Sequence, residues 1–260
     1  MDFVGIDIGS TSAKMVVLGE HAMKTVIPTG WSSKEAAANL QKILAENSVD
    51  LANAKVYATG YGRNAVSFAN KAITEITCHA KGGSSVFGGD CTILDVGGQD
   101  TKVISVKGGM VEDFLMNDKC SAGTGKFVEV MANRLNVSID ELFAMAEKGN
   151  ALPISSLCTV FAESEIISHI GEGKAREDIA AGIVDSVAAK VSQMAGRFRS
   201  SQSYILTGGL SHIAYFGQII SAKLNAPVTC APGGRFAGAL GAAILAGGAY
   251  SPDNNLMLTE

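Results

Sequence analysis

The sequence has no long hydrophobic run and no excess of basic residues. No stretch reaches the roughly 18 consecutive apolar residues that indicate a membrane-spanning helix, and the longest candidate, residues 236–249, is short and rich in glycine. The 21 Lys and Arg residues against 25 Asp and Glu give a formal charge of −4, which offers no basic footprint for nucleic acid. The first residues show no basic patch followed by an apolar stretch, so no secretory signal is expected. We therefore expect a cytoplasmic protein that binds neither nucleic acid nor a membrane.

The sequence also lacks the cysteine pattern of a disulfide framework. The cysteines are odd in number and widely spaced, which argues against disulfides in a cytosolic chain; they are Cys78, Cys91, Cys120, Cys158 and Cys230. Cys120 and Cys158 do not form a C-x-x-C motif, so their spacing alone does not predict a metal site. The other three lie in apolar contexts and are interpreted as structural. Cys78 precedes His79, but this pair lacks the further ligands of a metal site.

Apolar residues are abundant enough for a sizeable core. They make up 47% of the chain against 18% charged residues, which excludes a disordered chain. A length of 260 residues suits one large domain or two smaller ones. The 30 glycines exceed the usual share, and part of this surplus lies in two related segments.

A short internal repeat divides the chain. Asp7–Met15 recurs as Asp95–Val103, and aspartate, glycine and lysine coincide at positions 7/95, 9/97 and 14/102. An apolar run precedes each copy and two strand-like runs follow, so each copy predicts three strands joined by tight turns. The pattern predicts an α/β fold of two halves, and a cleft between the halves is the default ligand site.

The halves are expected to be residues 1–88 and 89–235, with the glycines at 82–83 and 88–89 in the best boundary region. A glycine- and alanine-rich helix at about 236–260 is expected to pack back on the first half, because small residues allow close packing. Periodicity predicts helices at 34–47, 125–135, 139–148, 178–197 and 211–224, and strands at 55–59, 204–207 and 227–230.

The repeated turns suit phosphate binding. Glycine lets the main chain approach an anion, and the backbone N–H groups of such a turn point at it. Hydroxyl groups and a lysine add donors, and the predicted phosphate contacts are Gly9, Ser10, Thr11, Ser12, Ala13, Lys14, Gly97 and Gly98. Asp7 and Asp95 would hold a magnesium ion through its water molecules. Ordinary hairpin turns are the alternative for one copy alone, and the Walker A pattern is absent.

Two glycine motifs downstream, Leu206–Gly209 and Gly238–Ala243, add to this pattern. Together with the paired Asp-x-Gly turns they resemble the actin and sugar-kinase ATPase superfamily. The resemblance implies two ribonuclease-H-like domains around a nucleotide cleft, which close over Mg-ATP. The Asp turns would hold the phosphates, and Gly208 and Gly209 would hold the adenosine.

Further residues extend the predicted nucleotide site. Phosphoryl transfer mainly needs positioning and charge neutralisation, and either of two residues could orient the attacking water. The candidates are Gln99 and Asp100 for the water, Gly123, Thr124 and Gly125 for a phosphate contact at a helix start, Glu129 for the ribose, and His212 and Arg235 for the adenosine end. The alternative for the last three is a solvated side chain.

Four segments, 58–63, 95–100, 117–127 and 155–165, carry a narrower resemblance. They are similar to the activator component of 2-hydroxyacyl-CoA dehydratases, an ATPase of the BadF/BadG type, over nearly the whole chain. In that family a homodimer carries one [4Fe-4S] cluster at its interface, which implies Cys120 and Cys158 as the ligands from each subunit. Ligand chemistry agrees in part, because such a cluster normally needs four thiolates. Both cysteines also precede helix-like segments, whose N-termini stabilise thiolates.

The resemblance implies an ATP-hydrolysing protein that passes one low-potential electron to a partner iron–sulfur enzyme of the 2-hydroxyacyl-CoA dehydratase type. Reduced ferredoxin or flavodoxin would supply the electron, and a nucleotide-driven switch would move the cysteine loops. The alternatives are a double-cubane cluster protein or a benzoyl-CoA reductase-like partner for the same chemistry, a small-molecule kinase of the superfamily, and an actin-like filament former.

Overall fold

The protein has the mixed α/β fold that the sequence predicts, and its described residues form two five-stranded sheets. The computed structural model describes residues 1–154, 158–198 and 203–250. The chain divides into two compact units. The first contains Met1–Ile93, Ile104–Phe114 and the described residues from Ala231, and the second contains Leu94–Val103 and Leu115–Cys230. Within the described ranges, no helix combines the length and apolarity that a membrane crossing requires.

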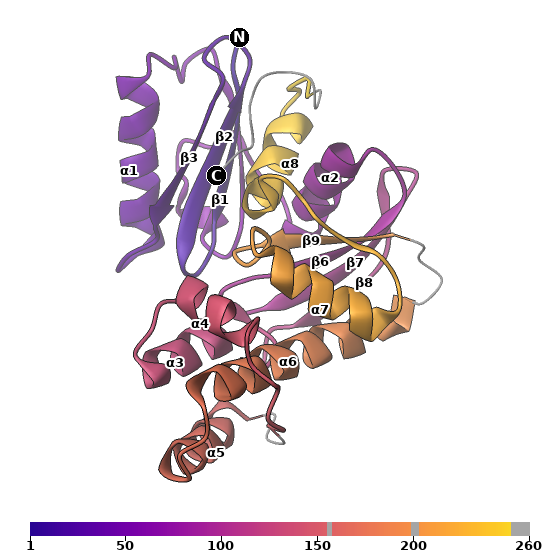
Figure 1. Ribbon diagram of the computed structural model, residues 1–260. Helices are drawn as coiled ribbons and strands as arrows, with labels where there is room; N and C mark the ends of the chain where they lie inside the picture. Colours follow the sequence, from indigo (N-terminus) through magenta and orange to yellow (C-terminus); the bar gives the residue numbers. More distant parts are fainter. Residues whose placement is uncertain (155–157, 199–202, 251–260) are drawn as a thin grey trace. The chain divides into compact units, whose positions relative to one another are not determined.

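The first sheet, in the order β3-β2-β1-β4-β5, is built on the first copy of the repeat. Its strands are β1 (Phe3–Ile8), β2 (Ser12–Leu18), β3 (Met23–Pro28), β4 (Lys55–Thr59) and β5 (Lys71–Ala72). Figure 1 shows helix α1 (Ser33–Glu46) on one side of these strands and helix α8 (Ala237–Leu245) on the other. Alternating residues of β2 explain this, because Met15 and Val17 pack with α1 whereas Val16 packs with α8.

Helix α2 (Glu75–Phe87) is not predicted by the sequence, because Gly82 is assigned to the boundary between the two halves. Glycine costs a helix about 1 kcal/mol relative to alanine, but α2 packs against α8 too closely for side chains. A Cβ atom added to Gly82 would lie 1.9 Å from the Ala237 carbonyl oxygen, and one added to Gly241 would lie 1.8 Å from the Cys78 carbonyl oxygen. Part of the glycine surplus therefore serves the close packing of α8 against α2.

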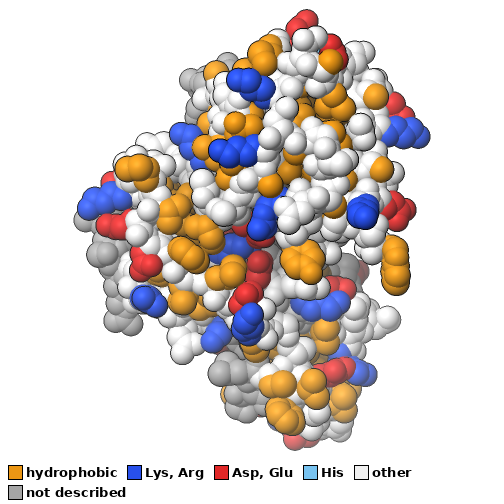
Figure 2. Space-filling view, turned by 180° about the vertical axis from the view of Figure 1, so that it is seen from behind, with side chains coloured by type: hydrophobic (Ala, Val, Ile, Leu, Met, Phe, Trp, Pro, Cys, Tyr) orange, Lys and Arg blue, Asp and Glu red, His pale blue; other side chains and the backbone are white. Residues whose placement is uncertain are grey.

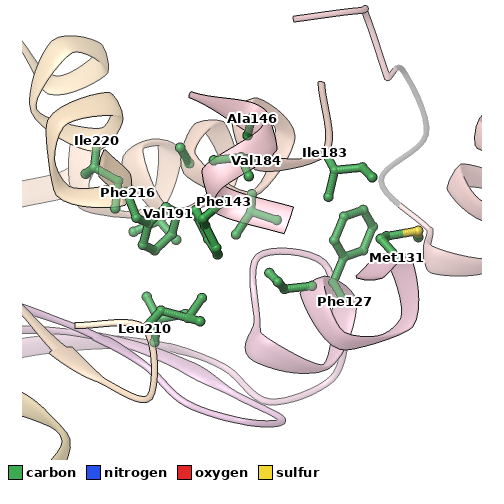
Figure 3. Packing of buried hydrophobic residues seen from close by; sticks show 14 of the residues in the cluster. Phe127, Met131, Phe143, Ala146, Ile183, Val184, Val191, Leu210, Phe216 and Ile220 are labelled. Atoms are coloured by element: carbon green, nitrogen blue, oxygen red, sulfur yellow. The ribbon is translucent and has the colours of Figure 1, made fainter. Parts of the chain in front are cut away.

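The second sheet has the order β10-β9-β6-β7-β8. Its strands are β6 (Cys91–Val96), β7 (Thr101–Lys107), β8 (Met110–Asn117), β9 (Tyr204–Gly208) and β10 (Val228–Cys230). The α-helices of the second unit are α3 (Gly125–Leu135), α4 (Ile139–Ala146), α5 (Thr159–Gly171), α6 (Arg176–Ala195) and α7 (Ala214–Leu224). Figure 3 shows side chains of α3, α4, α6 and α7 meeting in one hydrophobic cluster. Phe143 and Phe216 meet edge to face there, with 5.5 Å between their ring centroids.

Most elements coincide with the sequence prediction. Both three-stranded repeats are present, and β4 and α3 have the predicted bounds. Helix α6 begins two residues before the predicted position 178, and α7 begins at Ala214 because the residues after Gly208 form tight turns. The last helix ends at Leu245, and residues 251–260 of the predicted segment lie outside the described residues.

Charges of both signs are mixed on the surface. Figure 2 shows Lys and Arg side chains interspersed with Asp and Glu on the face that it presents. This mixture agrees with the formal charge of −4. That face therefore does not carry a strong field of a single sign, which long-range attraction of a polyanion would need.

Candidate functional site

The first predicted phosphate turn, Gly9–Ser12, closes between β1 and β2. The amide of Gly9 donates to the Ser12 carbonyl oxygen at 3.1 Å. Thr29, after β3, braces the turn: its amide donates to the Thr11 carbonyl oxygen at 3.0 Å and its hydroxyl to the Gly9 carbonyl oxygen at 2.7 Å. Ser10 and Thr11 are exposed, so an anion can reach the tip of a turn whose backbone is held from behind.

The residues that follow this turn contribute in different ways. Ala13 is fully buried in β2, so it can offer only its backbone to a ligand. Lys14 is half-buried and lies opposite Asp7 in the β1–β2 register. Its Nζ lies 3.5 Å from the position that a Cβ atom of Gly9 would take, which places the ammonium group at the turn.

Asp7 is buried directly before the turn, and backbone approaches its carboxylate closely. A Cβ atom at Gly60 would lie 2.5 Å from Oδ1 of Asp7, and one at Gly238 would lie 2.6 Å from Oδ2. The Nε2 atom of His79 lies 3.9 Å from the same Oδ2. Side chains at positions 60 and 238 would therefore displace the carboxylate, and glycine is needed at both.

The second turn, Gly97–Asp100, closes in the same way but has a different charge arrangement. The amide of Gly97 donates to the Asp100 carbonyl oxygen at 2.9 Å. The buried Nζ of Lys102 lies 3.3 Å from Oδ2 of Asp95 and 2.8 Å from Oδ2 of Asp100. The other oxygen of Asp95 accepts a hydrogen bond from the Thr207 hydroxyl at 2.9 Å. Both oxygens of Asp95 are thus engaged, and Lys102 compensates its charge.

The two residues predicted to orient water differ in how firmly they are held. Gln99 is exposed on the turn. Asp100 is partly buried, with its side chain 27% exposed, and the ion pair with Lys102 fixes its carboxylate. The structure therefore fixes the carboxylate of Asp100 and leaves the side chain of Gln99 exposed.

The Gly208–Gly209 element lies beside the second turn. The amide of Gly209 donates to the Val96 carbonyl oxygen at 3.2 Å, and a Cβ atom at Gly208 would lie 2.3 Å from that oxygen. The φ angle of Gly208 is 87°, in the region that favours glycine. Two glycine motifs that are distant in sequence therefore meet in the second unit, at the ends of the neighbouring strands β6 and β9.

The residues predicted at the nucleoside end are divided between the two units. Nε2 of His212 lies 3.2 Å from Oδ1 of Asp140. Glu129 pairs instead with Lys126, whose Nζ lies 3.2 Å from its Oε1. Arg235 lies in a short 3₁₀ helix of the first unit, so it is not part of the unit that holds Gly208.

A pocket of about 280 Å³ lies between α4 and the N-terminal part of α7. Its lining is partly apolar and partly polar, and includes Asp140, Phe143, Glu147, Ile213, Tyr215 and Gln218. Burial raises the pKa of Tyr215, so the phenol remains a hydrogen-bonding group at neutral pH. The volume lies below the usual range of pockets that enclose a whole small ligand, about 300–1,000 Å³.

The segment 123–125, at the start of α3, braces the second turn. Three hydrogen bonds make this connection: Gly125 amide to Gly97 carbonyl at 2.9 Å, Lys126 amide to Gly98 carbonyl at 2.7 Å, and Thr101 hydroxyl to Gly123 carbonyl at 2.6 Å. The amides of Gly125 and Thr124, which the sequence predicts near phosphate, thus donate to carbonyl groups of the protein. The segment links the phosphate turn to the loop that carries Cys120.

Asn117, the last residue of β8, holds the Cys120 loop. Its Nδ2 donates to the carbonyl oxygens of Cys120 and Ala122 at 2.8 and 3.0 Å, and its Oδ1 accepts from the Cys120 amide at 3.3 Å. The Thr124 hydroxyl adds a bond to the Ser121 carbonyl oxygen at 2.7 Å. Cys120 itself is exposed, so a fixed backbone presents this residue to solvent.

Cys158 is also exposed and occupies the N-cap position of α5. The Thr159 and Ser121 hydroxyl oxygens are 2.6 Å apart and share a hydrogen bond. Since Ser121 follows Cys120 and Thr159 follows Cys158, the structure brings the two cysteine loops together in one unit. Residues 155–157, which begin the motif around Cys158, lie outside the described residues.

The other three cysteines have a different environment. Burial raises the pKa of Cys78 to about 12 and that of Cys91 to about 11. Burial also raises the pKa of the half-buried Cys230. These thiols stay protonated at neutral pH, as expected for structural residues, whereas iron is bound by thiolates. The described residues contain no group of three or more His, Cys, Asp and Glu side chains that suits a metal ion.

Several residues of this site are missed by sequence reasoning. The repeat does carry a signal for Lys102, because it coincides with Lys14. His79 gives no such signal, since it lies on a helix that the sequence does not predict. The contact between Ser121 and Thr159 depends on folding alone, because 38 positions separate them.

Three known proteins resemble the chain over nearly its full length. The activator of lactoyl-CoA dehydratase from Anaerotignum propionicum is 40% identical over 250 residues, which cover 94% of this chain and 96% of that protein. The crystal structure of component A of Acidaminococcus fermentans (R)-2-hydroxyglutaryl-CoA dehydratase matches with a TM-score of 0.88 and 37% identity, over 94% of this chain and 97% of the other. The activator of 2-hydroxyisocaproyl-CoA dehydratase from Clostridium difficile, with bound ADPNP, matches with a TM-score of 0.86 and 38% identity, over 95% of this chain and 94% of the other.

The match to a family model agrees with these relatives. It extends over residues 4–246, which include both phosphate turns, both exposed cysteines and the Gly208–Gly209 element. The chain therefore belongs to the BadF/BadG/BcrA/BcrD ATPase family.

Proposed function

We propose that this protein is an ATP-hydrolysing iron–sulfur activator that reduces a partner iron–sulfur enzyme of the 2-hydroxyacyl-CoA dehydratase type by one electron. One observation carries the proposal: hydrogen bonds connect the second phosphate turn, through the start of α3, to a loop that presents an exposed cysteine. The names of the relatives support the same activity, since they are activators of such dehydratases.

The nucleotide contacts follow from the two turns. In the first unit, the tip of the turn Gly9–Ser12 and Lys14 offer amides, hydroxyls and a cation for phosphate. In the second unit the Gly98 amide is the proposed donor, because the Gly97 amide already donates to the Asp100 carbonyl oxygen. Asp100, held by Lys102, is our choice over Gln99 for orienting the attacking water. The His212 region and the adjoining pocket are proposed for the nucleoside. The ADPNP bound to a relative supports nucleotide binding.

For magnesium, Asp7 is a better ligand than Asp95. Lys102 and Thr207 already engage both oxygens of Asp95, and a compensated carboxylate attracts a cation less strongly. Beside Asp7, the ionic partner in the described part of the chain is His79, at the longer distance of 3.9 Å from Oδ2. We propose that Asp7 holds the ion through water and that Asp95 has a structural part.

The donor set suits a [4Fe-4S] cluster shared by two chains. Cys120 and Cys158 are the exposed thiols, they lie on adjoining loops, and α5 begins directly after Cys158. Two thiols are half of the four ligands that such a cluster normally needs, so the complete site requires a homodimer with the ligands on its two-fold axis. When bound, the cluster supplies a one-electron centre of low potential.

The electron balance is simple. Reduced ferredoxin or flavodoxin loses one electron, and the partner's own iron–sulfur centre gains it. The chain's own part is to bind ATP at the turns and to hold the two cysteine loops in a state that depends on the nucleotide. ATP hydrolysis makes the transfer effectively one-way.

Iron counting after anaerobic purification tests the proposal. Native protein should hold about four irons per dimer, as one cubane cluster requires. Cys120→Ser should lose the iron and keep ATP binding, whereas Cys230→Ser removes a thiol outside the site and should keep both. A native dimer that stays colourless after reconstitution under reductant would sink the electron-transfer function. Phosphorylation of a small molecule by such an iron-free protein would point to a kinase.

A further inference from the structure

We propose that the Ser121–Thr159 hydrogen bond positions the two cysteine loops of each chain relative to one another before iron binds. The inference rests on the function proposed above, since it concerns Cys120 and Cys158 as ligands. It assigns a positioning part to two hydroxyl groups that bond to each other.

The sequence places these hydroxyls next to the thiols. Ser121 follows Cys120 and Thr159 follows Cys158, and consecutive Cα atoms lie about 3.8 Å apart. Each cysteine backbone is therefore one residue from the bonded pair. The oxygens lie 2.6 Å apart, a short distance for a neutral O–H···O hydrogen bond. Movement of one cysteine loop away from the other must break or stretch this bond.

The two loops are otherwise anchored to different parts of the unit. The Cys120 loop is held by Asn117 of β8 and by Thr124 at the start of α3. The Cys158 end begins α5, which is tied to α3 by the ion pair between Arg134 and Glu163, more than one turn further along the helix. Among the described residues, Ser121–Thr159 is the side-chain hydrogen bond that joins segment 117–124 directly to the first turn of α5.

Pre-positioning matters because a cluster needs all its thiolates at once. If the loops move independently, binding of iron must order both, and each ordered residue costs conformational entropy. A bond that orders them beforehand removes part of that cost from the binding step. Loss of one such bond should speed iron release about fivefold, which corresponds to about 1 kcal/mol.

The variants are Ser121→Ala, Thr159→Val and both together, each purified as the full dimer without oxygen. Iron release to a chelator is followed by absorbance. Each single variant should release iron about fivefold faster than the native protein. The double variant should be no faster than either single one, because both changes remove the same bond.

Two controls separate positioning from general damage. Thr159→Ser keeps the hydroxyl and should release iron at the native rate. Ser164→Ala removes a hydroxyl from α5 that bonds only to the Val160 carbonyl oxygen of the same helix, and it should also release iron at the native rate.

A second measurement needs no iron. Amide hydrogen exchange in the iron-free protein should be faster at residues 121–124 and 159–162 in both single variants and unchanged in Ser164→Ala. Native rates of exchange and of iron release in the single variants, or additive effects in the double variant, overturn the inference. If the native protein binds no iron, the function proposed above fails, and the exchange measurement still decides whether this bond orders the two loops.

Discussion

Replacing Lys102 with methionine tests how strongly the second phosphate turn depends on buried charge. The Lys102 side chain is 3% exposed and that of Asp95 is 2% exposed, and Nζ lies within 3.3 Å of Asp95 and 2.8 Å of Asp100. Removing the cation leaves a buried carboxylate without its counter-charge, and such changes cost about 3–5 kcal/mol. The free energy of unfolding of a whole domain is only about 5–15 kcal/mol, so the variant should be severely destabilised.

Urea unfolding followed by circular dichroism measures this loss. Fluorescence is less suitable, because the single tryptophan, Trp31, is 95% exposed and would change little. Lys14→Met is the matched control: this lysine occupies the equivalent position of the repeat but is half-buried, and its loss should cost less than about 1 kcal/mol. Adding Asp95→Asn to the Lys102→Met variant should restore part of the stability. The reasoning would be refuted if the two lysine variants lost equal amounts of unfolding free energy, or if the double variant recovered none of it.

Three further changes test other parts of the structure. In iron-free protein at pH 8, iodoacetamide should modify Cys120 and leave Cys78 unmodified by mass spectrometry, because burial raises the pKa of Cys78 to about 12. Burial opposes ionisation of Asp2, but hydrogen bonds from the amide and imidazole of His21 hold the pKa of Asp2 below the usual 3.8. The ionised Asp2 carboxylate therefore stabilises the fold above pH 3.8, and this stabilisation is lost as the pH falls through the lowered pKa. The stability difference between native protein and Asp2→Asn should therefore disappear in acid unfolding curves. Gly241→Ala should lower the melting temperature strongly, since its Cβ atom would lie 1.8 Å from a carbonyl oxygen, at a cost of about 1–3 kcal/mol or more, whereas Gly89→Ala, with open space around it, should not.

The sequence predicted the local architecture well where the signal was local. The repeat at positions 7 and 95 predicted two three-stranded units, and both are present. Strand and helix bounds followed from apolar runs and periodicity. Helix α2 was missed because it contains glycine, which disfavours a helix in isolation, and Gly82 is needed where α8 packs against it. Helix propensity gives the cost of glycine in α2, but it could not show that packing against α8 offsets this cost.

The candidate site divides in the same way. Residue types and spacing were enough to select the phosphate turns, and the resemblance to the family selected Cys120 and Cys158. Neither indicated that the repeated aspartates have different partners. Asp7 lies near His79 from a distant helix, whereas Asp95 is paired with Lys102 and Thr207. Partners of this kind depend on which strands and helices become neighbours.

The sequence by itself determined a repeated α/β segment and a pair of glycine turns suited to phosphate, and its resemblance to the family singled out a particular pair of cysteines. Only the tertiary structure decided which carboxylate is already compensated, which thiols are exposed, and that hydroxyls 38 positions apart join the two cysteine loops. The reason is physical. A turn or a strand is favoured by residues that are adjacent in the chain, whereas burial, ion pairing and side-chain hydrogen bonding depend on atoms that become neighbours only when the elements pack.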